Sequence, residues 1–169
     1  MPSQYGFVFD HSKCIQCHSC EVACKSWRDV ELGIHWRRVN NIWKNHYPEV
    51  TCLSVSVACM HCVEPECIKA CPEEAIQKLP DNGVVVVDRD KCIGCQTCLY
   101  ACPFGIPQFG EDEKMQKCDL CVHEIDYQDE VPPCVRACPT EALLFEEMAV
   151  ERKKKMEKFI EDILSSDRE

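Results

Sequence analysis

The chain has 169 residues, 46% of them hydrophobic and 28% charged, which is enough for one compact domain or two small lobes. Its formal net charge of −10 disfavours a nucleic-acid-binding protein, because phosphates require a basic surface, and it suits a partner with a basic docking face. The 17 cysteines, about one residue in ten, leave disulfide scaffolds, zinc proteins and iron-sulfur proteins as the classes to weigh.

The first residues lack the pattern of a secretory signal, which combines a basic start, an apolar core and a small-residue cleavage site. The longest aliphatic run, residues 84–87, is far shorter than the roughly 20 residues of a membrane-spanning helix. We therefore expect a cytoplasmic chain with no direct membrane span, which would attach to a membrane or cross one only together with a partner.

The first predicted element is a short strand at residues 5–9, which runs into the first cysteines. The connection 25–58 shows no compact hairpin. It ends in a predicted strand at residues 51–57, in which Cys52 is expected to be a small buried apolar residue. The aromatic side chains of the connection are expected to pack against the rest of the chain, and they are Trp27, Trp36, Trp43 and Tyr47.

A hairpin is predicted next, with strands at residues 75–78 and 84–87 joined by the turn Pro-Asp-Asn-Gly at residues 80–83. A further strand at residues 142–145 could lie beside residues 5–9. From residue 146 onward, helical spacing predicts a C-terminal helix that packs on the lobes or on a partner. Its apolar face would consist of Met156, Phe159, Ile160, Ile163 and Leu164.

Sixteen of the cysteines form four groups of four, and only Cys52 is left over. Group one is Cys14, Cys17, Cys20 and Cys24; group two is Cys59, Cys62, Cys67 and Cys71; group three is Cys92, Cys95, Cys98 and Cys102; group four is Cys118, Cys121, Cys134 and Cys138. Group three has the spacing C-x2-C-x2-C-x3-C before Pro103, by which bacterial ferredoxins hold [4Fe-4S] clusters. Group one has the same spacing, and groups two and four lengthen one gap. These spacings predict [4Fe-4S] clusters with the sixteen cysteines as iron ligands.

Zinc is the main alternative, because paired C-x2-C elements also form four-cysteine zinc sites. Such sites usually draw two cysteines from each of two separated loops, whereas groups one and three each place four cysteines within 11 residues. That density would leave zinc with surplus thiols. His18 and His61 lie inside cysteine groups and could bind iron as histidines do in Rieske centres, but each group already supplies four thiolates.

Two internal repeats relate the groups to one another. Residues 7–15 align with 85–93, both reading as a strand that enters a cysteine loop, and residues 67–76 align with 134–143. The predicted hairpin joins groups two and three as in a small two-cluster ferredoxin, in which the fourth cysteine of each run binds the other cluster. Groups two and three should then form one lobe, and groups one and four the other. The alternative pairs group one with two and group three with four, and would have to close the connection 25–58.

The crossover between groups predicts four ligand sets. Set 1 is Cys14, Cys17, Cys20 and Cys138; set 2 is Cys24, Cys118, Cys121 and Cys134; set 3 is Cys59, Cys62, Cys67 and Cys102; set 4 is Cys71, Cys92, Cys95 and Cys98. The predicted fold is α+β, with two ferredoxin-like βαββαβ lobes, one nested within the other, and a C-terminal helix. The outer lobe would cover residues 1–51 and 104–145, the inner lobe residues 52–103, and the helix residues 146–169.

Several short stretches add to the order of the four groups. They are residues 4–7 (QYGF), 20–25 (CEVACK), 36–39 (WRRV), 59–62 (CMHC), 83–88 (GVVVVD) and 92–95 (CIGC). With these stretches, about residues 4–145 resemble the iron-sulfur subunits of complex iron-sulfur molybdoenzymes, above all the electron-transfer subunit of dimethyl sulfoxide reductase. The resemblance implies four [4Fe-4S] clusters in two nested halves. It also implies two partners, a molybdenum or tungsten catalytic subunit and a second redox subunit, which is quinone-reactive in the membrane or contains flavin.

We therefore predict a non-catalytic electron-transfer subunit of an oxidoreductase complex. The sequence contains no catalytic triad, no phosphate loop and no G-x-G-x-x-G fingerprint. The alternatives are the electron-transfer subunit of a hydrogenase or of a formate-oxidising complex, a free soluble polyferredoxin, and a structural zinc protein.

Overall fold

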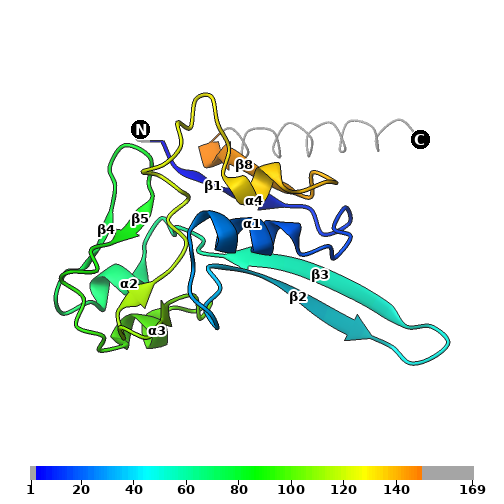
Figure 1. The fold of residues 1–169 in the computed structure, drawn as a ribbon, viewed down its shortest axis with the longest axis horizontal. Coiled ribbons are helices and arrows are strands. Elements are labelled where there is room, and N and C mark those ends of the chain that lie inside the picture. Colours follow the sequence, from blue (N-terminus) through cyan, green and yellow to red (C-terminus); the bar gives the residue numbers. More distant parts are fainter. Residues whose placement is uncertain (1–2, 150–169) are drawn as a thin grey trace, which may run out of the picture.

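The structure, a computed structural model, describes residues 3–149. It contains short helices and two-stranded sheets, and one long hairpin projects from this body (Figure 1). The elements in chain order are β1 (Tyr5–Phe9), α1 (Ser19–Trp27), β2 (Arg37–Lys44), β3 (Thr51–Ala58), α2 (Glu66–Lys69), β4 (Ile76–Lys78), β5 (Val85–Val87), α3 (Thr97–Ala101), β6 (Gln108–Phe109), β7 (Met115–Gln116), α4 (Pro133–Arg136) and β8 (Leu143–Glu147). The predicted mixture of helix and strand is therefore confirmed for these residues.

The first and last strands of the described chain lie side by side. β1 pairs antiparallel with β8, and Phe7 stands opposite Phe145. The ring of Phe145 lies 5.4 Å from that of Tyr5 and 4.8 Å from that of Tyr127, so aromatic contacts hold the pair to the loop that precedes α4. The predicted neighbourhood of residues 5–9 and 142–145 is confirmed.

The predicted central hairpin is also present. β4 pairs antiparallel with β5, and Ile76 stands opposite Val87. Gly83 closes the turn at φ +72°, a backbone conformation that glycine adopts without steric cost. The side-chain amide of Gln4 donates hydrogen bonds to the carbonyl oxygens of Gly83 and His61, at 3.2 and 3.1 Å. Gln4 therefore ties the start of β1 to the central hairpin.

Two similar helix pairs accompany these two sheets. α1 packs against α4, which also contacts β8, and α2 packs against α3 near β4. Each helix carries a cysteine, namely Cys20 and Cys24 in α1, Cys67 in α2, Cys98 in α3 and Cys134 in α4. The internal repeats of the sequence thus correspond to repeated pairs of helices.

The connection 25–58 contains a long hairpin, so the expectation of no compact hairpin there is wrong. β2 and β3 form an antiparallel ladder from the pair Arg37 and Ala58 to the pair Lys44 and Thr51. Its buried face carries polar side chains, Ser54 and Ser56, so the usual contrast between an apolar and a polar face is weak in the sequence.

Near the tip of the hairpin, 67% of Trp43 and 92% of Tyr47 are exposed, so the prediction that these two rings pack against the body is also wrong. Cys52, opposite Trp43, lies in the predicted strand but is half-buried rather than buried.

The buried core contains cysteines in each of its parts. Leu143 and Val39 pack with Cys20, Cys24 and Cys134. The other two parts consist of Ala58, Val84, Cys118 and Leu120, and of Ile76, Val85, Cys98 and Met115. The thiols of these five cysteines are therefore internal groups of the fold.

β8 extends through Glu147, so the prediction that a helix begins at residue 146 is wrong for Glu146 and Glu147. Met148 and Ala149, which follow β8, are helical, and the predicted helix from residue 150 onward lies outside the described residues. Within residues 3–149, no helix is both long enough and apolar enough to cross a bilayer. The predicted lobe boundary between residues 51 and 52 falls at the start of β3 and stays a prediction.

Leu143 and Leu144 provide a matched test of this core, since 1% of Leu143 and 37% of Leu144 is exposed. We expect Leu143→Ala to lower the free energy of unfolding by about 2–5 kcal/mol, because the vacated volume lies among buried side chains. Leu144→Ala should cost about 1 kcal/mol or less. Anaerobic urea unfolding of the full chain measures both values, and equal losses would contradict the described register of β8.

Candidate metal centres

All 17 cysteines lie within residues 3–149, and each carries a free thiol. The loops of groups one and three have the same backbone conformation at equivalent positions. Gln16 and His18 have φ of 63° and 58°, and Gly94 and Gln96 have φ of 70° and 60°. In each group, the two left-handed residues flank the second cysteine. Both loops therefore curl tightly before the chain enters a helix, α1 or α3.

One cavity, with about 320 Å³ of empty space, is lined by the four thiols of set 4 together with apolar side chains. These thiols are Cys71, Cys92, Cys95 and Cys98. Two sulfurs accept backbone hydrogen bonds: the amide of Ala75 donates to Cys71 Sγ and that of Met115 to Cys92 Sγ, both at 3.3 Å. Amide donors of this kind favour the thiolate over the thiol.

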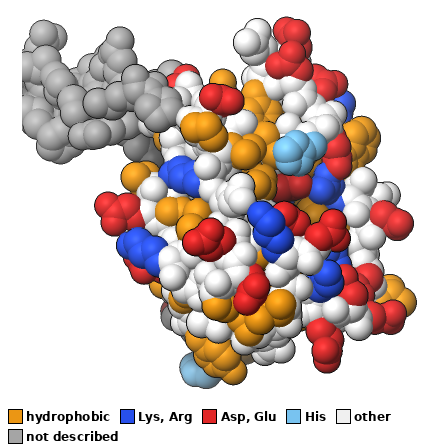
Figure 2. Space-filling model, turned by 90° about the vertical axis from the view of Figure 1, so that its left-hand side faces the viewer, with side chains coloured by type: hydrophobic (Ala, Val, Ile, Leu, Met, Phe, Trp, Pro, Cys, Tyr) orange, Lys and Arg blue, Asp and Glu red, His pale blue; other side chains and the backbone are white. Residues whose placement is uncertain are grey.

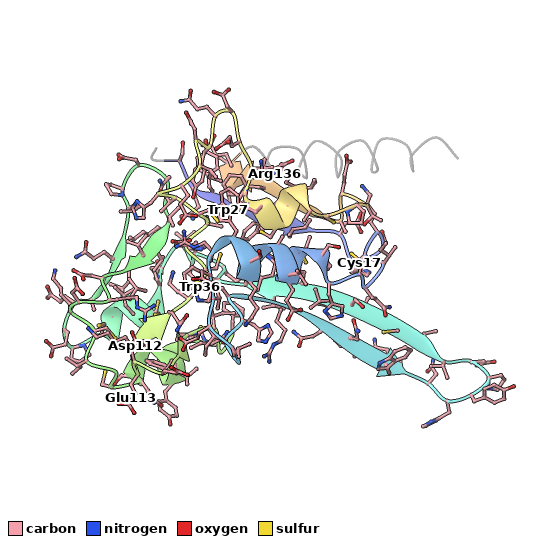
Figure 3. All side chains as sticks on the ribbon, viewed as in Figure 1. Cys17, Trp27, Trp36, Asp112, Glu113 and Arg136 are labelled. Carbon is pink, nitrogen blue, oxygen red and sulfur yellow. The ribbon has the colours of Figure 1, made fainter. Side chains whose placement is uncertain are left out.

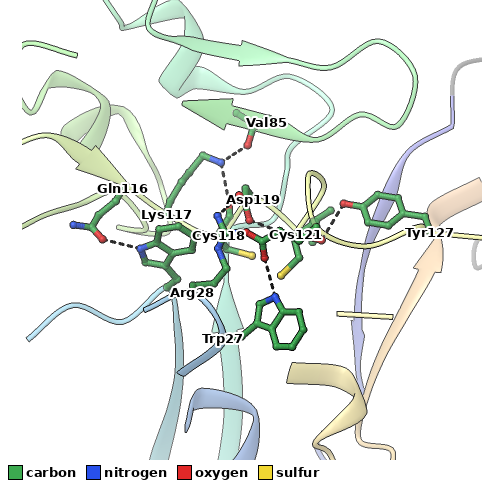
Figure 4. Close-up of polar contacts among 12 residues, drawn as sticks. Trp27, Arg28, Val85, Gln116, Lys117, Cys118, Asp119, Cys121 and Tyr127 are labelled. Carbon is green, nitrogen blue, oxygen red and sulfur yellow. Dashed lines mark hydrogen bonds and ion pairs between the residues drawn. The ribbon is translucent and has the colours of Figure 1, made fainter. Parts of the chain in front are cut away.

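A second cavity, with about 330 Å³ of empty space, is lined by the four thiols of set 3, which are Cys59, Cys62, Cys67 and Cys102. The side chain of Lys117 reaches the wall of the same cavity, although only 4% of this residue is exposed. Its ammonium group donates hydrogen bonds to the carbonyl oxygens of Val85 and, at 3.0 Å, Cys118 (Figure 4). Lys117 thus connects the set 3 cavity with the segment that carries Cys118.

The thiols of set 2 are buried beside α1 and α4, and these thiols are Cys24, Cys118, Cys121 and Cys134. Burial, reinforced by Cys134 and other neighbours, raises the pKa of Cys24 to about 12. Burial, together with Asp119 and Cys134, raises the pKa of Cys121 to about 12 as well. A thiolate at one of these cysteines disfavours ionisation of the next one. Deprotonation of the whole set therefore requires a positively charged group among the sulfurs.

Set 1 is brought together in part. Burial raises the pKa of Cys20, and Cys134 and Cys138 act in the same direction, so Cys20 lies near both. Cys14 is half-buried and Cys17 exposed, in the loop before α1. Cys17 lies on the opposite side of the body from the loop that carries Asp112 and Glu113 (Figure 3).

Sets 3 and 4 fit a [4Fe-4S] cluster. Four thiols around an apolar cavity are the ligands that such clusters use. Within residues 3–149, no three cysteine, histidine or carboxylate side chains converge as the ligands of a single metal ion do. In a [4Fe-4S] cluster each thiolate binds a different iron atom, so its ligands surround a volume instead of a point.

Both histidines of the cysteine loops contact other groups through one ring nitrogen. His61, of which 1% is exposed, accepts a hydrogen bond at Nδ1 from the backbone amide of Val85 at 2.9 Å. Burial, with Lys117 and Lys78 nearby, holds the pKa of His61 well below its usual value. The Nδ1 atom of His18 lies 3.0 Å from a carboxylate oxygen of Glu21.

Two buried cations beside the thiols, Arg37 and Lys117, have no clear signal in the sequence. Only 2% of Arg37 and 4% of Lys117 is exposed. Charged residues are mostly found at the surface, so sequence alone favours an exposed position for each. The single local hint is that Lys117 directly precedes a cysteine group.

Comparison with known families agrees with this chemistry. The 4Fe-4S dicluster domain family matches residues 50–148, and a 4Fe-4S binding domain family matches residues 11–27. The chain therefore belongs to the 4Fe-4S dicluster domain family.

Several individual proteins are similar to this chain over most of its length. The protein is 40% identical to a chain of the anaerobic dimethyl sulfoxide reductase of Escherichia coli (strain K12), across 91% of its own length and 78% of that relative. It is 37% identical to a subunit of the sulfite dehydrogenase of Allochromatium vinosum, across 85% of its own length and 68% of that relative. It is 38% identical to the formate dehydrogenase iron-sulfur subunit of Wolinella succinogenes, across 82% of its own length and 78% of that relative. The resemblance to the iron-sulfur subunit of dimethyl sulfoxide reductase is thus confirmed.

Gly94 provides a test of the group three loop. It has φ of +70°, and a Cβ atom there would lie 2.6 Å from the carbonyl oxygen of Glu113. We expect Gly94→Ala to lower the iron content, because the loop between Cys92 and Cys95 would have to shift. Gly105 is the control, since its φ is +61° but no atom lies within 4 Å of the added Cβ. Gly105→Ala should keep all iron and cost only about 1 kcal/mol of stability. Equal iron contents in the two variants, determined anaerobically, would contradict the described loop.

Proposed function

We propose that this chain is a non-catalytic electron-transfer subunit that holds four [4Fe-4S] clusters. The observation that carries the proposal is the convergence of thiols from separate groups. Cys102 lines one cavity with three cysteines of group two, and Cys71 lines another with three cysteines of group three. This crossover is the ligand pattern of two-cluster ferredoxins.

We extend this pattern to all four sets defined above. Sets 3 and 4 would belong to an inner lobe at residues 52–103, and sets 1 and 2 to an outer lobe at residues 1–51 and 104–145. The β4–β5 hairpin and the β1–β8 pair support this nested arrangement, because each joins the two cysteine groups of one lobe.

Neighbouring sets are also close in space. Cys20 of set 1 lies near Cys134 of set 2, and Cys67 of set 3 lies near Cys98 of set 4. Lys117 lies between set 2 and the cavity of set 3. The sets therefore follow one another in the order 1, 2, 3, 4.

The bound clusters would supply one-electron redox chemistry. The residues of this chain would hold the clusters in series, donate backbone hydrogen bonds to thiolate sulfur, and exclude water from the cavities. Raised thiol pKa values imply that cluster insertion releases protons from the buried cysteines. No part of this role requires a substrate pocket in this chain.

The names of the relatives support a partner in a larger complex, because they are chains or subunits of a dimethyl sulfoxide reductase, a sulfite dehydrogenase and a formate dehydrogenase. We propose a molybdenum or tungsten catalytic subunit as one partner and a quinone-reactive or flavin-containing subunit as the other. The formate dehydrogenase relative keeps open the alternative of a formate-oxidising complex. A hydrogenase subunit and a free polyferredoxin are the remaining alternatives, and a free carrier would purify alone.

Metal analysis tests the number and the pairing of the clusters. The anaerobically purified chain should contain about 16 irons and as many sulfides. Cys52→Ala, which removes the cysteine outside the four groups, should leave both numbers unchanged. Cys67→Ala/Cys102→Ala removes two ligands of one set and should leave about 12 irons. Cys67→Ala/Cys98→Ala removes ligands of two sets and should leave about 8 irons.

A colourless, iron-poor wild-type chain would refute the proposed function. Equal iron contents in the two double variants would refute the pairing of sets 3 and 4 while leaving the function standing.

The hairpin of β2 and β3 is the surface that we assign to the catalytic partner. Its outer part exposes 46% of Ile42, 67% of Trp43, 92% of Tyr47 and 49% of Val50. The opposite end of the molecule also exposes an aromatic ring, that of Tyr100 in α3, but its acidic and basic side chains are spread among the hydrophobic ones (Figure 2). Exposed aromatic rings near one another are typical of residues that contribute most to binding between subunits.

We expect Trp43→Ser/Tyr47→Ser to reduce recovery of the catalytic subunit with this chain from native cells by at least about tenfold, since each buried aromatic contributes about 2 kcal/mol or more. Leu32→Ser is the control, because Leu32 is 93% exposed but lies outside the hairpin. Iron content should stay at the wild-type value in both. Undiminished recovery of the complex would show that the hairpin does not bind this partner.

A further inference from the structure

Arg37, the first residue of β2, is buried at the base of the long hairpin. Only 2% of it is exposed. Its Nη1 atom donates a hydrogen bond to Ser56 Oγ at 3.0 Å, and its guanidinium carbon lies 4.0 Å from the centre of the Phe7 ring. The Nε and Nη2 atoms are buried and have no hydrogen-bond partner within the described structure. The side chain thus offers two unused donors in the interior.

The groups that raise the pKa of Arg37 are neighbouring cysteines. Burial lowers the pKa of Arg37, but Cys134, Cys118, Cys20 and Cys24 together raise it above its ordinary value. Arg37 in turn acts to lower the pKa of Cys24, Cys118 and Cys121, against the larger opposite effect of burial. Arg37 and Val39 lie on the same buried face of β2, and Val39 packs in the core with Cys20, Cys24 and Cys134. Arg37 therefore lies on the side of β2 that faces thiols of sets 1 and 2.

Set 1 is connected to the same guanidinium through Ser56. Ser56, which accepts the hydrogen bond from Arg37, lies with its Oγ 3.5 Å from the Sγ atom of Cys20. Arg37 therefore lies beside thiols of both set 1 and set 2.

An arginine that stays charged cannot be buried without a compensating anion, because its desolvation costs several kcal/mol. Arg28, which is only partly buried, differs, because it pairs with the carboxylate of Asp119 at 2.7 Å. The ion pairs formed within residues 3–149 give Arg37 no such carboxylate. The cysteine thiolates and the clusters that they would bind are therefore the anions that can balance the charge of Arg37.

We propose that Arg37 is a positioning residue whose fixed positive charge raises the reduction potentials of the two clusters beside α1 and α4, held by sets 1 and 2, an inference that rests on the proposed function and ligand sets. Reduction adds one negative charge to a cluster, and a nearby cation in a dry interior stabilises that charge. Phe7, whose ring lies 4.0 Å from the guanidinium carbon, packs against the core cluster that contains Cys20 of set 1 and Cys24 and Cys134 of set 2. Both clusters thus have higher potentials than they would have without Arg37.

The test is an anaerobic redox titration of the full chain, followed by electron paramagnetic resonance. In Arg37→Gln, we expect the reduction equilibrium constant of at least one of these two clusters to fall at least tenfold, which is about 59 mV for a one-electron couple. Arg37→Lys keeps the charge and should restore most of the wild-type value. Arg38→Gln is the matched control, because it removes the same charge from the exposed neighbour on β2 and should change no potential measurably.

Two outcomes would overturn the inference. One is an Arg37→Gln protein with full iron content whose titration coincides with that of the wild type. The other is an equal shift in Arg37→Gln and Arg37→Lys, since that would indicate a packing effect instead of a charge effect. A wild-type chain without iron or any reducible signal would instead refute the proposed function.

A second measurement covers an Arg37→Gln chain that loses its clusters. The wild type and Arg37→Lys are prepared with 15N-arginine, and hyperfine coupling of 15N to the reduced clusters is recorded. Coupling in the wild type that is absent from Arg37→Lys supports the inference. No coupling in the wild type, or coupling that persists in Arg37→Lys and so arises from another arginine, overturns it.

Discussion

Convergence of thiols from distant segments is the constraint on which this structure depends. Cys102 shares a cavity with group two, and Cys71 shares one with group three, so the two segments must run past each other. An antiparallel pair of strands produces such a crossing, within the β4–β5 hairpin and again where β1 meets β8. In the same way, α2 packs against α3 and α1 packs against α4, which brings cysteines of two groups together. Cysteines of these helices also belong to the buried core.

The same convergence creates an electrostatic cost, because buried thiols close to one another resist ionisation. Burial and neighbouring thiols raise the pKa of Cys98 to about 11, and burial holds that of Cys118 well above its usual value. The interior balances this with cations: Arg37 and Lys117 are buried beside thiols, although the chain has 29 acidic and 19 basic residues. A core that served only to bury apolar side chains would not contain two buried cations.

The sequence predicts those features of the fold and the site that depend on a single local pattern. Cysteine spacing indicated the cofactor, and the valines at residues 84–87 after a Pro-Asp-Asn-Gly turn indicated the central hairpin. The long hairpin was missed because its inward face carries Ser54 and Ser56, which contact Asn41 and Arg37. The burial of Arg37 could not be foreseen, since it depends on partners that only the folded chain brings near. The ligand sets and lobe boundaries stay predictions.

The pairing of β1 with β8 also determines the order in which the molecule can be completed on the ribosome. Tyr5 stands opposite Glu147, so the first strand to be translated has no partner until nearly all of the described chain has been made. The β4–β5 hairpin, by contrast, closes within about a dozen residues. During synthesis, the cysteines near the start of the chain therefore stay exposed to solvent for the longest time. Their thiols are the ones most accessible to oxidation before translation ends.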